Sequence, residues 1–391
     1  MTDDKGTTPM SERETVALIG PGWPFKGGIA SHTTYLYRAL RDLGPVLFIT
    51  LRRQYPHWLY PGGDDRAPDD RTLFEPDAQR VLAPLSPLAW WRGARAIARA
   101  NPAHIVIPWW HVFWAPMTLA LLAMLRRQCP KAHIVFLVHN TVGHEEHRVA
   151  WHIARWVLCR GDAWIVHARS EAEQLHSMLG DVPAHYEPHP AYPVDQRKAP
   201  DRSTARAQLA LADVPTLLFF GFVRPYKGLE TLLEALALLK DAPHCQLVVA
   251  GEIWGEALPW NQLLANLGIS TQVRLENRYI PENEVATYFA AADLVVLPYR
   301  SATGSGVVRL AHSHGRPVLV TRTGALPDAV EAGVTGYIVP PADPAALMQA
   351  IRSFFTTASR SAMEQAARRS TQTDDWQRLA RTILHQARST T

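Results

Sequence analysis

The chain has 391 residues, of which 47% are hydrophobic and 19% charged. This length and composition favour two packed domains and exclude an intrinsically disordered protein. A net charge of +4 suits an anionic substrate, a phospholipid surface or an ordinary arginine-rich protein, and it does not indicate nucleic-acid binding.

Targeting signals are missing from the sequence pattern. Residues 1–14 are polar, lack the apolar core of a signal peptide and are expected to be flexible. No apolar run reaches the roughly 18 residues of a membrane span. The three cysteines form no CxxC pair, so we expect a cytoplasmic protein without a zinc knuckle or a disulfide framework.

Short apolar runs alternate with helix-like segments in the first half of the chain. This alternation predicts a parallel sheet covered by helices on both faces. Residues 54–87 are expected to form a long loop. The predicted strands are Thr15–Gly20, Val46–Leu51, His104–Trp109, His133–Val138 and Asp162–His167, and the predicted helices are Ile29–Leu43, Leu88–Ala100, Ala115–Arg127, Glu145–Cys159 and Arg169–Leu179.

Five prolines between residues 188 and 215 interrupt this pattern, and we place a domain linker at about 190–200. The alternation then resumes, and a last helix is expected at Met363–Ala387. The predicted strands are Thr216–Gly221, Gln246–Gly251, Gln272–Glu276, Asp293–Leu297, Pro317–Thr321 and Gly336–Val339, and the predicted helices are Leu229–Lys240, Trp260–Leu267, Glu284–Ala291, Gly306–His314, Pro327–Ala332 and Pro344–Phe355.

The first candidate ligand loop connects the first strand to the first helix and ends in Gly27-Gly28. These glycines allow a backbone to approach a phosphate, and the helix that follows offers free N–H groups. The loop is neither a GxGxxG fingerprint nor a P-loop. A strand-to-helix turn without a ligand is the alternative interpretation.

Two further loops of the same kind belong to the second half of the chain. Arg224 and Lys227 follow the strand that ends at Gly221, where two cations can clamp a diphosphate; solvated surface charges are the alternative. Thr303, Gly304, Ser305, Gly306 and Val307 precede an apolar helix, which indicates either a phosphate-binding helix start or a helix capped by Ser305.

The order of several motifs resembles that of retaining GT-B glycosyltransferases, most closely glycosyltransferase family 4. These motifs are Gly221 with Arg224-Pro225-Tyr226-Lys227-Gly228, Ala291-Ala292-Asp293 with Leu297-Pro298, Gly315-Arg316-Pro317-Val318, and Gly324-Ala325-Leu326-Pro327. The Gly27-Gly28 loop and His139-Asn140 resemble the first domain of the same family. The similarity covers roughly residues 15–385 and is stronger in the second domain.

The resemblance implies an α/β fold with two Rossmann-like domains that face a cleft. Residues 15–195 would bind the acceptor, residues 196–358 would bind the nucleotide sugar, and residues 359–391 would form a helix returning to the first domain. It implies transfer of a hexose-type sugar, with retention and without a catalytic metal, from a nucleotide-diphosphate donor to a glycan, lipid-linked or small-molecule acceptor. We find no metal cluster in the sequence and expect no cofactor beyond the donor.

The resemblance also assigns roles to single residues. His139 would lie near the reacting sugar, Arg224 and Lys227 would bind the diphosphate, and the backbone near Tyr279 would bind the nucleobase. We nominate His139, Arg224 and Lys227 as catalytic, and Gly27, Gly28, Tyr279 and the segment Thr303–Val307 as donor-binding.

This sequence departs from the family pattern at two places. Phe222 directly follows the strand-ending glycine, where the family has an arginine. The Glu-x7-Glu signature is absent, because its two positions fall at Ala302 and Leu310. We interpret the chain as a divergent subgroup. The alternatives are a GT-B nucleotide-sugar epimerase, against which the scarcity of carboxylates between Glu284 and Asp328 argues, and a catalytically silent nucleotide-sugar-binding partner.

Ten of the thirteen tryptophans precede residue 165, several of them beside arginines such as Arg92 and Arg95. Tryptophan with arginine suits a bilayer interface or a sugar-stacking surface, and core packing is the alternative. Peripheral association with an anionic membrane, at the inner face of the cell membrane, is therefore a hypothesis.

Overall fold

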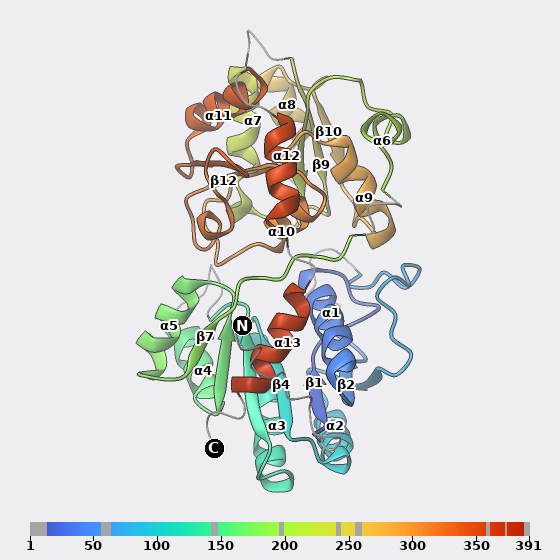
Figure 1. Cartoon of the computed structure of the whole chain (residues 1–391), viewed down its shortest axis with the longest axis vertical. Coiled ribbons are helices and arrows are strands. Elements are labelled where there is room, and N and C mark those ends of the chain that lie inside the picture. The colour runs from blue at the N-terminus through green and yellow to red at the C-terminus, as the bar shows by residue number, and fades with distance from the viewer. Residues whose placement is uncertain are drawn as a thin grey trace, which may run out of the picture.

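The computed structural model describes residues 14–55, 64–141, 148–194, 199–239, 244–254, 260–356, 360–371 and 374–386. These residues form two α/β lobes, stacked along the long axis of the molecule (Figure 1). Each lobe contains one parallel sheet, so the predicted two-domain α/β fold is confirmed.

The first domain contains a seven-stranded sheet in the order β3-β2-β1-β4-β5-β6-β7, and every pairing is parallel. Its central strands read as continuous apolar runs because helices cover both faces. The strands are β1 (Val16–Ile19), β2 (Val46–Leu51), β3 (Gln79–Leu82), β4 (His104–Trp109), β5 (His133–Val138), β6 (Ala163–Val166) and β7 (Ala184–Tyr186), and the helices are α1 (Gly28–Leu43), α2 (Pro87–Ala100), η1 (Val112–Trp114), α3 (Ala115–Gln128), α4 (Arg148–Leu158) and α5 (Arg169–Leu179).

The second domain contains a six-stranded parallel sheet in the order β10-β9-β8-β11-β12-β13. Two apolar clusters, one on each face, form its core. The strands are β8 (Thr216–Phe220), β9 (Gln246–Ala250), β10 (Val273–Glu276), β11 (Leu294–Leu297), β12 (Val318–Thr321) and β13 (Gly336–Val339), and the helices are α6 (Arg202–Gln208), η2 (Pro225–Lys227), α7 (Leu229–Leu238), α8 (Trp260–Leu267), α9 (Glu282–Ala291), α10 (Gly306–Ser313), η3 (Pro327–Ala329) and α11 (Pro344–Thr356).

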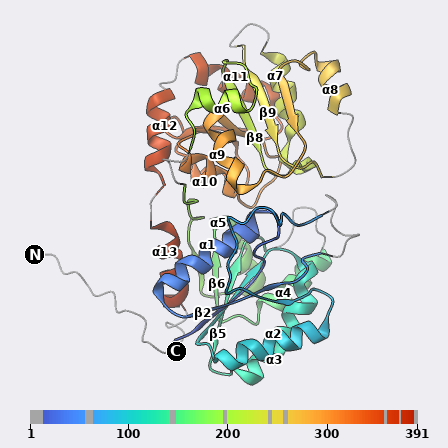
Figure 2. The same cartoon turned by 90° about the vertical axis from the view of Figure 1, so that its right-hand side faces the viewer.

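The chain ends in two helices that belong to different lobes. Helix α12 (Arg360–Arg369) packs on α10 in the second domain, and α13 (Asp375–Gln386) packs along α1 in the first domain (Figures 1 and 2). Trp376, Leu379 and Ile383 of α13 join the apolar cluster that contains Tyr37 and Leu40 of α1. The expected return of the chain to the first domain is therefore confirmed.

The prediction of one last helix over 363–387 is wrong, because α12 ends at Arg369 and α13 begins at Asp375. The predicted helix at 327–332 is a single 3-10 turn, η3. The first correction divides one predicted helix between the two domains, and the second shortens a predicted helix to a single turn.

Two strands and one α-helix were missed in the sequence. Strand β3 lies in the predicted long loop of residues 54–87, and β7 contains only three residues. Both are edge strands that are not fully buried, so they lack the apolar run by which we recognised the central strands. Helix α6 lies just after the expected linker, where the Asp201 carboxylate accepts a hydrogen bond from the Thr204 N–H and caps the helix.

Candidate active site

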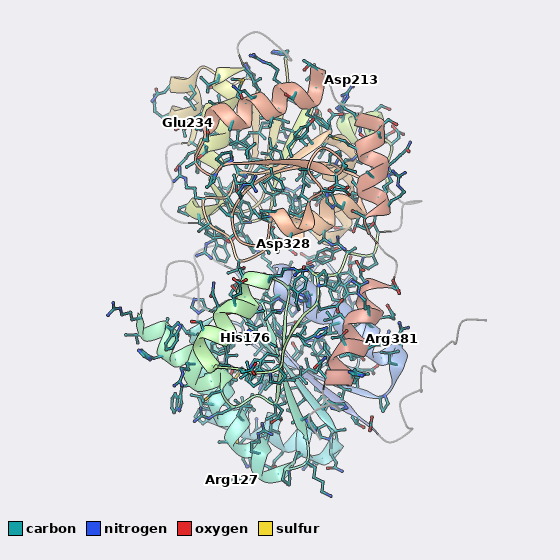
Figure 3. All side chains as sticks on the ribbon, turned by 60° about the vertical axis from the view of Figure 1, so that its left-hand side comes forward. Arg127, His176, Asp213, Glu234, Asp328 and Arg381 are labelled. Carbon is teal, nitrogen blue, oxygen red and sulfur yellow. The ribbon has the colours of Figure 1, made fainter. Side chains whose placement is uncertain are left out.

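A cavity of about 610 Å³ lies between the two domains, at the carboxyl ends of strands from both sheets. Its walls include the start of α1 and the residues after β5 and β6 in the first domain, and the residues after β8, β9 and β11 in the second. Asp328, which lines this cavity, lies at the junction of the lobes in Figure 3. Ligands of open α/β sheets bind at this kind of edge.

The Gly27-Gly28 loop forms the first-domain wall of the cavity. Gly27 has φ +101°, which favours glycine, and it precedes the first residue of α1. A Cβ on Gly27 would lie 3.3 Å from the Phe222 ring, whereas a Cβ on Gly28 would meet nothing within 4 Å. The N-terminus of α1 is therefore open toward the cavity, and Phe222 of the second domain covers the loop beside it.

Lys227 lies on the opposite wall, where it lines the cavity and is only 8% exposed. Burial lowers its pKa. Its ammonium lies 5.4 Å from the centre of the Tyr299 ring, and no carboxylate pairs with it among the described residues. Gly228 follows with φ +67°, where a Cβ would come within 2.2 Å of the Pro298 carbonyl oxygen. This glycine therefore permits the tight turn that directs Lys227 inward.

Arg224 does not line the cavity, although the sequence suggested that it shares a diphosphate with Lys227. Its guanidinium lies 5.3 Å from the Trp254 ring and 5.5 Å from the Tyr226 ring. Arg224 is extended and stands outside the 3-10 turn that contains Lys227. Arg224 is nevertheless close enough to Lys227 that its charge contributes to the lowered pKa of the lysine, after burial.

The segment Thr303–Val307 lines the cavity and leads into α10. The Ser305 hydroxyl accepts a hydrogen bond from the Val307 N–H at 3.3 Å, so it caps the helix. The Thr303 hydroxyl donates to the Asn140 side chain of the first domain. A Cβ on Gly306 would lie 2.9 Å from the Tyr192 hydroxyl, so glycine allows α10 to approach the residues between the domains.

His139 also lines the cavity, and it lies among three histidines that we did not connect with it in the sequence: His32, His167 and His189. The centre of the His32 ring lies 4.7 Å from that of His139, 5.0 Å from that of His167 and 5.2 Å from that of His189. We call these four residues the histidine cluster. One signal was available: His139 and His167 directly follow neighbouring parallel strands, whose ends must meet.

Burial is the largest cause of a lowered pKa in all four residues of the histidine cluster. The pKa of His167 falls to about 4 and that of His189 to about 3. Mutual repulsion among the imidazoles contributes further to the low pKa values of His32 and His139. At neutral pH the cluster is therefore uncharged.

Tyr279 lines the cavity beside Gly27 and Phe222. Its ring centre lies 6.5 Å from that of Phe222, and the Lys26 ammonium lies 5.5 Å from the Tyr279 ring centre. Burial, followed by the charge of Glu282, raises the pKa of its phenol. Two aromatic rings thus stand close together on one side of the cavity, an arrangement that can enclose a planar base.

Leu310 lines the cavity at one position of the missing glutamate pair, but carboxylates from other elements reach the same space. Glu252, after β9, pairs with Lys26 of the first domain at 3.2 Å. Glu282, at the start of α9, accepts a hydrogen bond from the Tyr35 hydroxyl at 3.4 Å. Burial, followed by the charge of Asp70, raises the pKa of Glu282. The cavity therefore has carboxylates that the family motif did not indicate.

The sequence is similar to those of known glycosyltransferases. Residues 214–357 match a family model described as "Glycosyl transferases group 1". Over 215 residues, 52% of this chain, the sequence is 35% identical to D-inositol 3-phosphate glycosyltransferase 1 of Catenulispora acidiphila, and that match spans 51% of the relative. A second match, to D-inositol 3-phosphate glycosyltransferase of Mycobacterium tuberculosis, is 34% identical over 47% of this chain and 38% of the relative. The matches thus span about half or less of these curated relatives.

Solved structures share the whole fold. Sucrose-phosphate synthase of Thermosynechococcus elongatus aligns with a TM-score of 0.75 at 20% identity, over 96% of this chain and 99% of that one. Anabaena HepE, solved in complex with UDP, aligns with a TM-score of 0.67 at 16% identity, over 96% of this chain and 98% of that one. The expected resemblance to GT-B glycosyltransferases is confirmed.

Proposed function

We propose that this chain, whose residues 214–357 form a glycosyl transferase group 1 domain, transfers a hexose-type sugar from a nucleotide-diphosphate donor to an acceptor in the interdomain cavity. The donor would lie mainly against the second domain and the acceptor against the first. The reaction would retain the configuration of the anomeric carbon.

The observation that carries this proposal is the environment of Lys227. A buried ammonium without a carboxylate partner is costly, and an anionic ligand removes that cost. Lys227 lines the cavity close to the segment Thr303–Val307, where main-chain N–H groups of a helix start face the same space. A diphosphate matches both features, because it carries concentrated negative charge and several acceptor oxygens.

Lys227 and the N-terminus of α10 would stabilise the negative charge that develops on the leaving diphosphate as the glycosidic bond breaks. No catalytic metal is required in this scheme, because these groups already supply positive charge. We nominate no protein nucleophile: a donor phosphate oxygen would accept the proton of the acceptor hydroxyl on the face from which the diphosphate leaves. His139 would contact the reacting sugar, and Tyr279 and Phe222 would enclose the base.

Contacts between the domains would exclude water from the reaction. Lys26 pairs with Glu252, the Glu282 N–H donates to the Asp70 carboxylate at 2.6 Å, and the Thr303 hydroxyl donates to Asn140. Each contact joins one domain to the other at the rim or wall of the cavity. Closure of this kind would limit hydrolysis of the donor.

A transfer assay tests the proposal. The full-length protein is incubated with UDP-, ADP- and GDP-sugars and a panel of polyol, sugar-phosphate and lipid-linked acceptors, while released nucleoside diphosphate is measured and products are examined by NMR. We expect one donor class to give acceptor-dependent release and a product with the donor's anomeric configuration. Lys227→Met should lower kcat/KM by about 100-fold or more, as loss of a transition-state charge contact does, whereas Lys131→Met, at an exposed lysine, should not change it.

Other outcomes of the same assay contradict the proposal in distinct ways. An epimerised nucleotide sugar formed without an acceptor would identify an epimerase. Donor binding without turnover across the whole panel would identify a silent nucleotide-sugar-binding partner. A product of inverted configuration would overturn the retaining mechanism alone.

We also propose that the first domain binds an anionic membrane surface. Helices α2 and α4 both pack against α3 (Figure 2), and they expose Leu88, Trp91, Val149 and Trp156. Arg95 lies over the Trp91 ring at 4.9 Å, and Arg160 lies over the Trp156 ring at 5.2 Å. Exposed tryptophan with arginine suits lipid headgroups. No helix in the described part of the chain is long and apolar enough to cross a membrane.

Vesicle co-sedimentation tests this location. The wild-type protein should pellet with anionic vesicles at low salt and not with neutral ones, and Trp91→Ser with Trp156→Ser should release it. Wild-type protein that stays in the supernatant with anionic vesicles contradicts membrane binding.

A further inference from the structure

In three members of the histidine cluster, ring nitrogens that could bind a metal ion lie close together. His32 lies on α1, whereas His139 and His167 directly follow β5 and β6. One ring nitrogen from each of the three lies within 4.8 Å of the corresponding nitrogens of the other two. Three elements far apart in the sequence thus bring three imidazoles to one point on the cavity wall.

Hydrogen bonding fixes the tautomer of His167. Its Nδ1 lies 2.8 Å from the Glu187 carbonyl oxygen, which can only accept, so Nδ1 carries the proton and Nε2 carries the lone pair. Metal-ligating histidines are usually held in this way: the ring nitrogen that does not bind the metal donates a hydrogen bond to a carbonyl, a carboxylate or a water. The His167 Nε2 lies 3.0 Å from the His32 Nε2.

His139 has an unused nitrogen. Its Nε2 is buried and has no hydrogen-bond partner among the described residues. A buried polar atom without a partner costs free energy, so this unpartnered nitrogen suggests a missing ligand. His139 and His167 also line the cavity, which gives a solute access to them.

We propose that His32, His139 and His167 form a binding site for a zinc-type divalent cation on the first-domain wall of the cavity. In a tetrahedral site with Zn–N bonds of about 2.0–2.1 Å, neighbouring nitrogens lie about 3.3 Å apart. The three nitrogens already lie within 4.8 Å of one another, so each pair would have to approach by at most about 1.5 Å. Neutral imidazoles suit Zn²⁺, Co²⁺ and Ni²⁺ rather than Mg²⁺ or Ca²⁺, which prefer oxygen ligands.

The ion would replace the hydrogen bond between His32 and His167. The His32 proton would move from Nε2 to Nδ1, so no net proton would be released. Three protein ligands leave the fourth tetrahedral position open toward the cavity, where a water or a ligand hydroxyl can complete the coordination. His139 would belong both to this site and to the proposed sugar position, but cation binding by the three histidines does not depend on the proposed transfer reaction.

Metal titration of the full-length, metal-free protein tests the site without any donor or acceptor. Zn²⁺ and Mg²⁺ are titrated by calorimetry, and Co²⁺ is followed by its visible absorption, which reports tetrahedral coordination. We expect one Zn²⁺ per chain, a tetrahedral Co²⁺ spectrum and no Mg²⁺ binding. His139→Gln and His167→Gln should each weaken Zn²⁺ binding by about 100-fold or more. Loss of a residue that only hydrogen-bonds to a metal ligand already costs about ten- to a hundredfold, and loss of the ligand itself should cost at least as much.

The control variant is His176→Gln, which removes an exposed histidine on α5 (Figure 3) and should bind Zn²⁺ like the wild type. Circular dichroism of each variant separates loss of a ligand from loss of the fold, and His139→Gln is the variant to use if His167→Gln does not fold. Absence of stoichiometric Zn²⁺ binding by the wild type overturns the proposal. Undiminished binding by His139→Gln does so as well.

Discussion

Two histidines of the second domain, His312 and His314, are buried at the end of α10, away from the histidine cluster. Burial lowers the pKa of each to about 4, and nearby arginines add to the effect, Arg309 for His312 and Arg316 with Arg368 for His314. His314 also stacks on Phe289, with ring centres 5.0 Å apart. Both side chains are therefore neutral in the folded protein at mildly acidic pH.

These two residues predict a loss of stability on acidification. Below the ordinary histidine pKa of about 6.5, the unfolded chain binds protons that the folded chain does not, so falling pH favours unfolding. As the pH falls from 6.5 to about 4, each residue should lower the free energy of unfolding by up to about 1.4 kcal/mol per pH unit. Urea denaturation at several pH values should show a shallower decline for His314→Gln, and a still shallower one for the double variant with His312→Gln. Equal slopes in all three proteins would contradict the assignment.

The candidate site shows how far the role of a single residue could be predicted from the sequence. Lys227 was identified from its place after a strand, and it does line the cavity. Arg224 was given the same role because only its spacing was visible, whereas its side chain packs against Trp254. Glu252 was missed because no motif marks it. Such contacts depend on the direction of each side chain and on how the two domains meet. A sequence pattern records neither.

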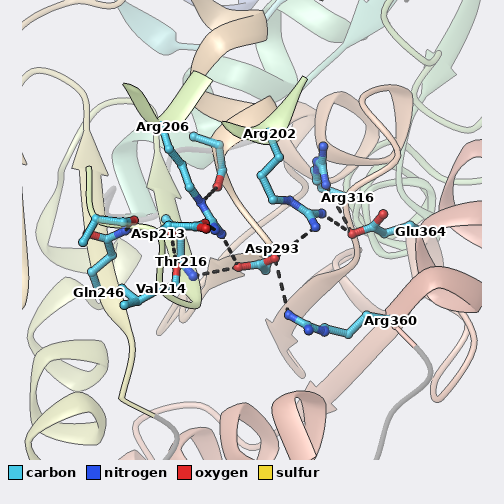
Figure 4. A network of polar contacts seen from close by, with 12 residues as sticks. Arg202, Arg206, Asp213, Val214, Thr216, Gln246, Asp293, Arg316, Arg360 and Glu364 are labelled. Carbon is cyan, nitrogen blue, oxygen red and sulfur yellow. Dashed lines mark hydrogen bonds and ion pairs between the residues drawn. The ribbon is translucent and has the colours of Figure 1, made fainter. Parts of the chain in front are cut away.

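Asp293, just before β11, holds several elements of the second domain together. Its side chain is buried, and it accepts hydrogen bonds from the Arg206 guanidinium and the Thr216 N–H, both at 2.8 Å (Figure 4). Arg202 and Arg360 approach its other oxygen at 3.4 and 3.6 Å. One carboxylate thus ties α6, the start of β8 and the start of α12 to the central sheet.

Replacing this carboxylate should destabilise the domain strongly. Asp293→Asn leaves Arg206 without its buried charge partner, and breaking a buried ion pair costs about 3–5 kcal/mol. Asp213 pairs with the same arginine but is exposed, so Asp213→Asn should cost about 1 kcal/mol or less. Chemical denaturation of the two variants measures both values. A cost for Asp293→Asn no larger than that for Asp213→Asn would contradict the role of the network.

At the scale of elements, the buried central strands could be predicted because their continuous apolar runs are visible in the sequence. The edge strands β3 and β7 could not, since an edge strand needs no continuous apolar run. The break between α12 and α13 was also hidden, because both helices have apolar faces and they bury those faces against different domains.

The segment that links the two domains contains His189 and Ala191, and it forms hydrogen bonds with both α10 and α13. Arg309 of α10 donates to the His189 carbonyl oxygen at 3.0 Å and to the Asp375 carboxylate of α13 at 2.9 Å. The Asp375 carboxylate in turn accepts from the Ala191 N–H, and the Trp376 indole donates to the Ala191 carbonyl oxygen. The two-domain plan could be predicted from the repeated strand–helix alternation. These contacts could not, because they join residues more than 60 positions apart.

The central claim, that the interdomain cavity binds the diphosphate of a nucleotide donor through Lys227, is tested most directly by binding calorimetry. Nucleoside diphosphates and the matching nucleosides are titrated into the wild type, Lys227→Met and the control Lys131→Met. We predict that one nucleoside diphosphate binds the wild type and the control alike. Lys227→Met should weaken that binding by about tenfold or more, the value of a charge-assisted contact, without changing the affinity for the nucleoside. Equal affinity of the wild type and Lys227→Met for the diphosphate, or no diphosphate binding at all, would contradict the account.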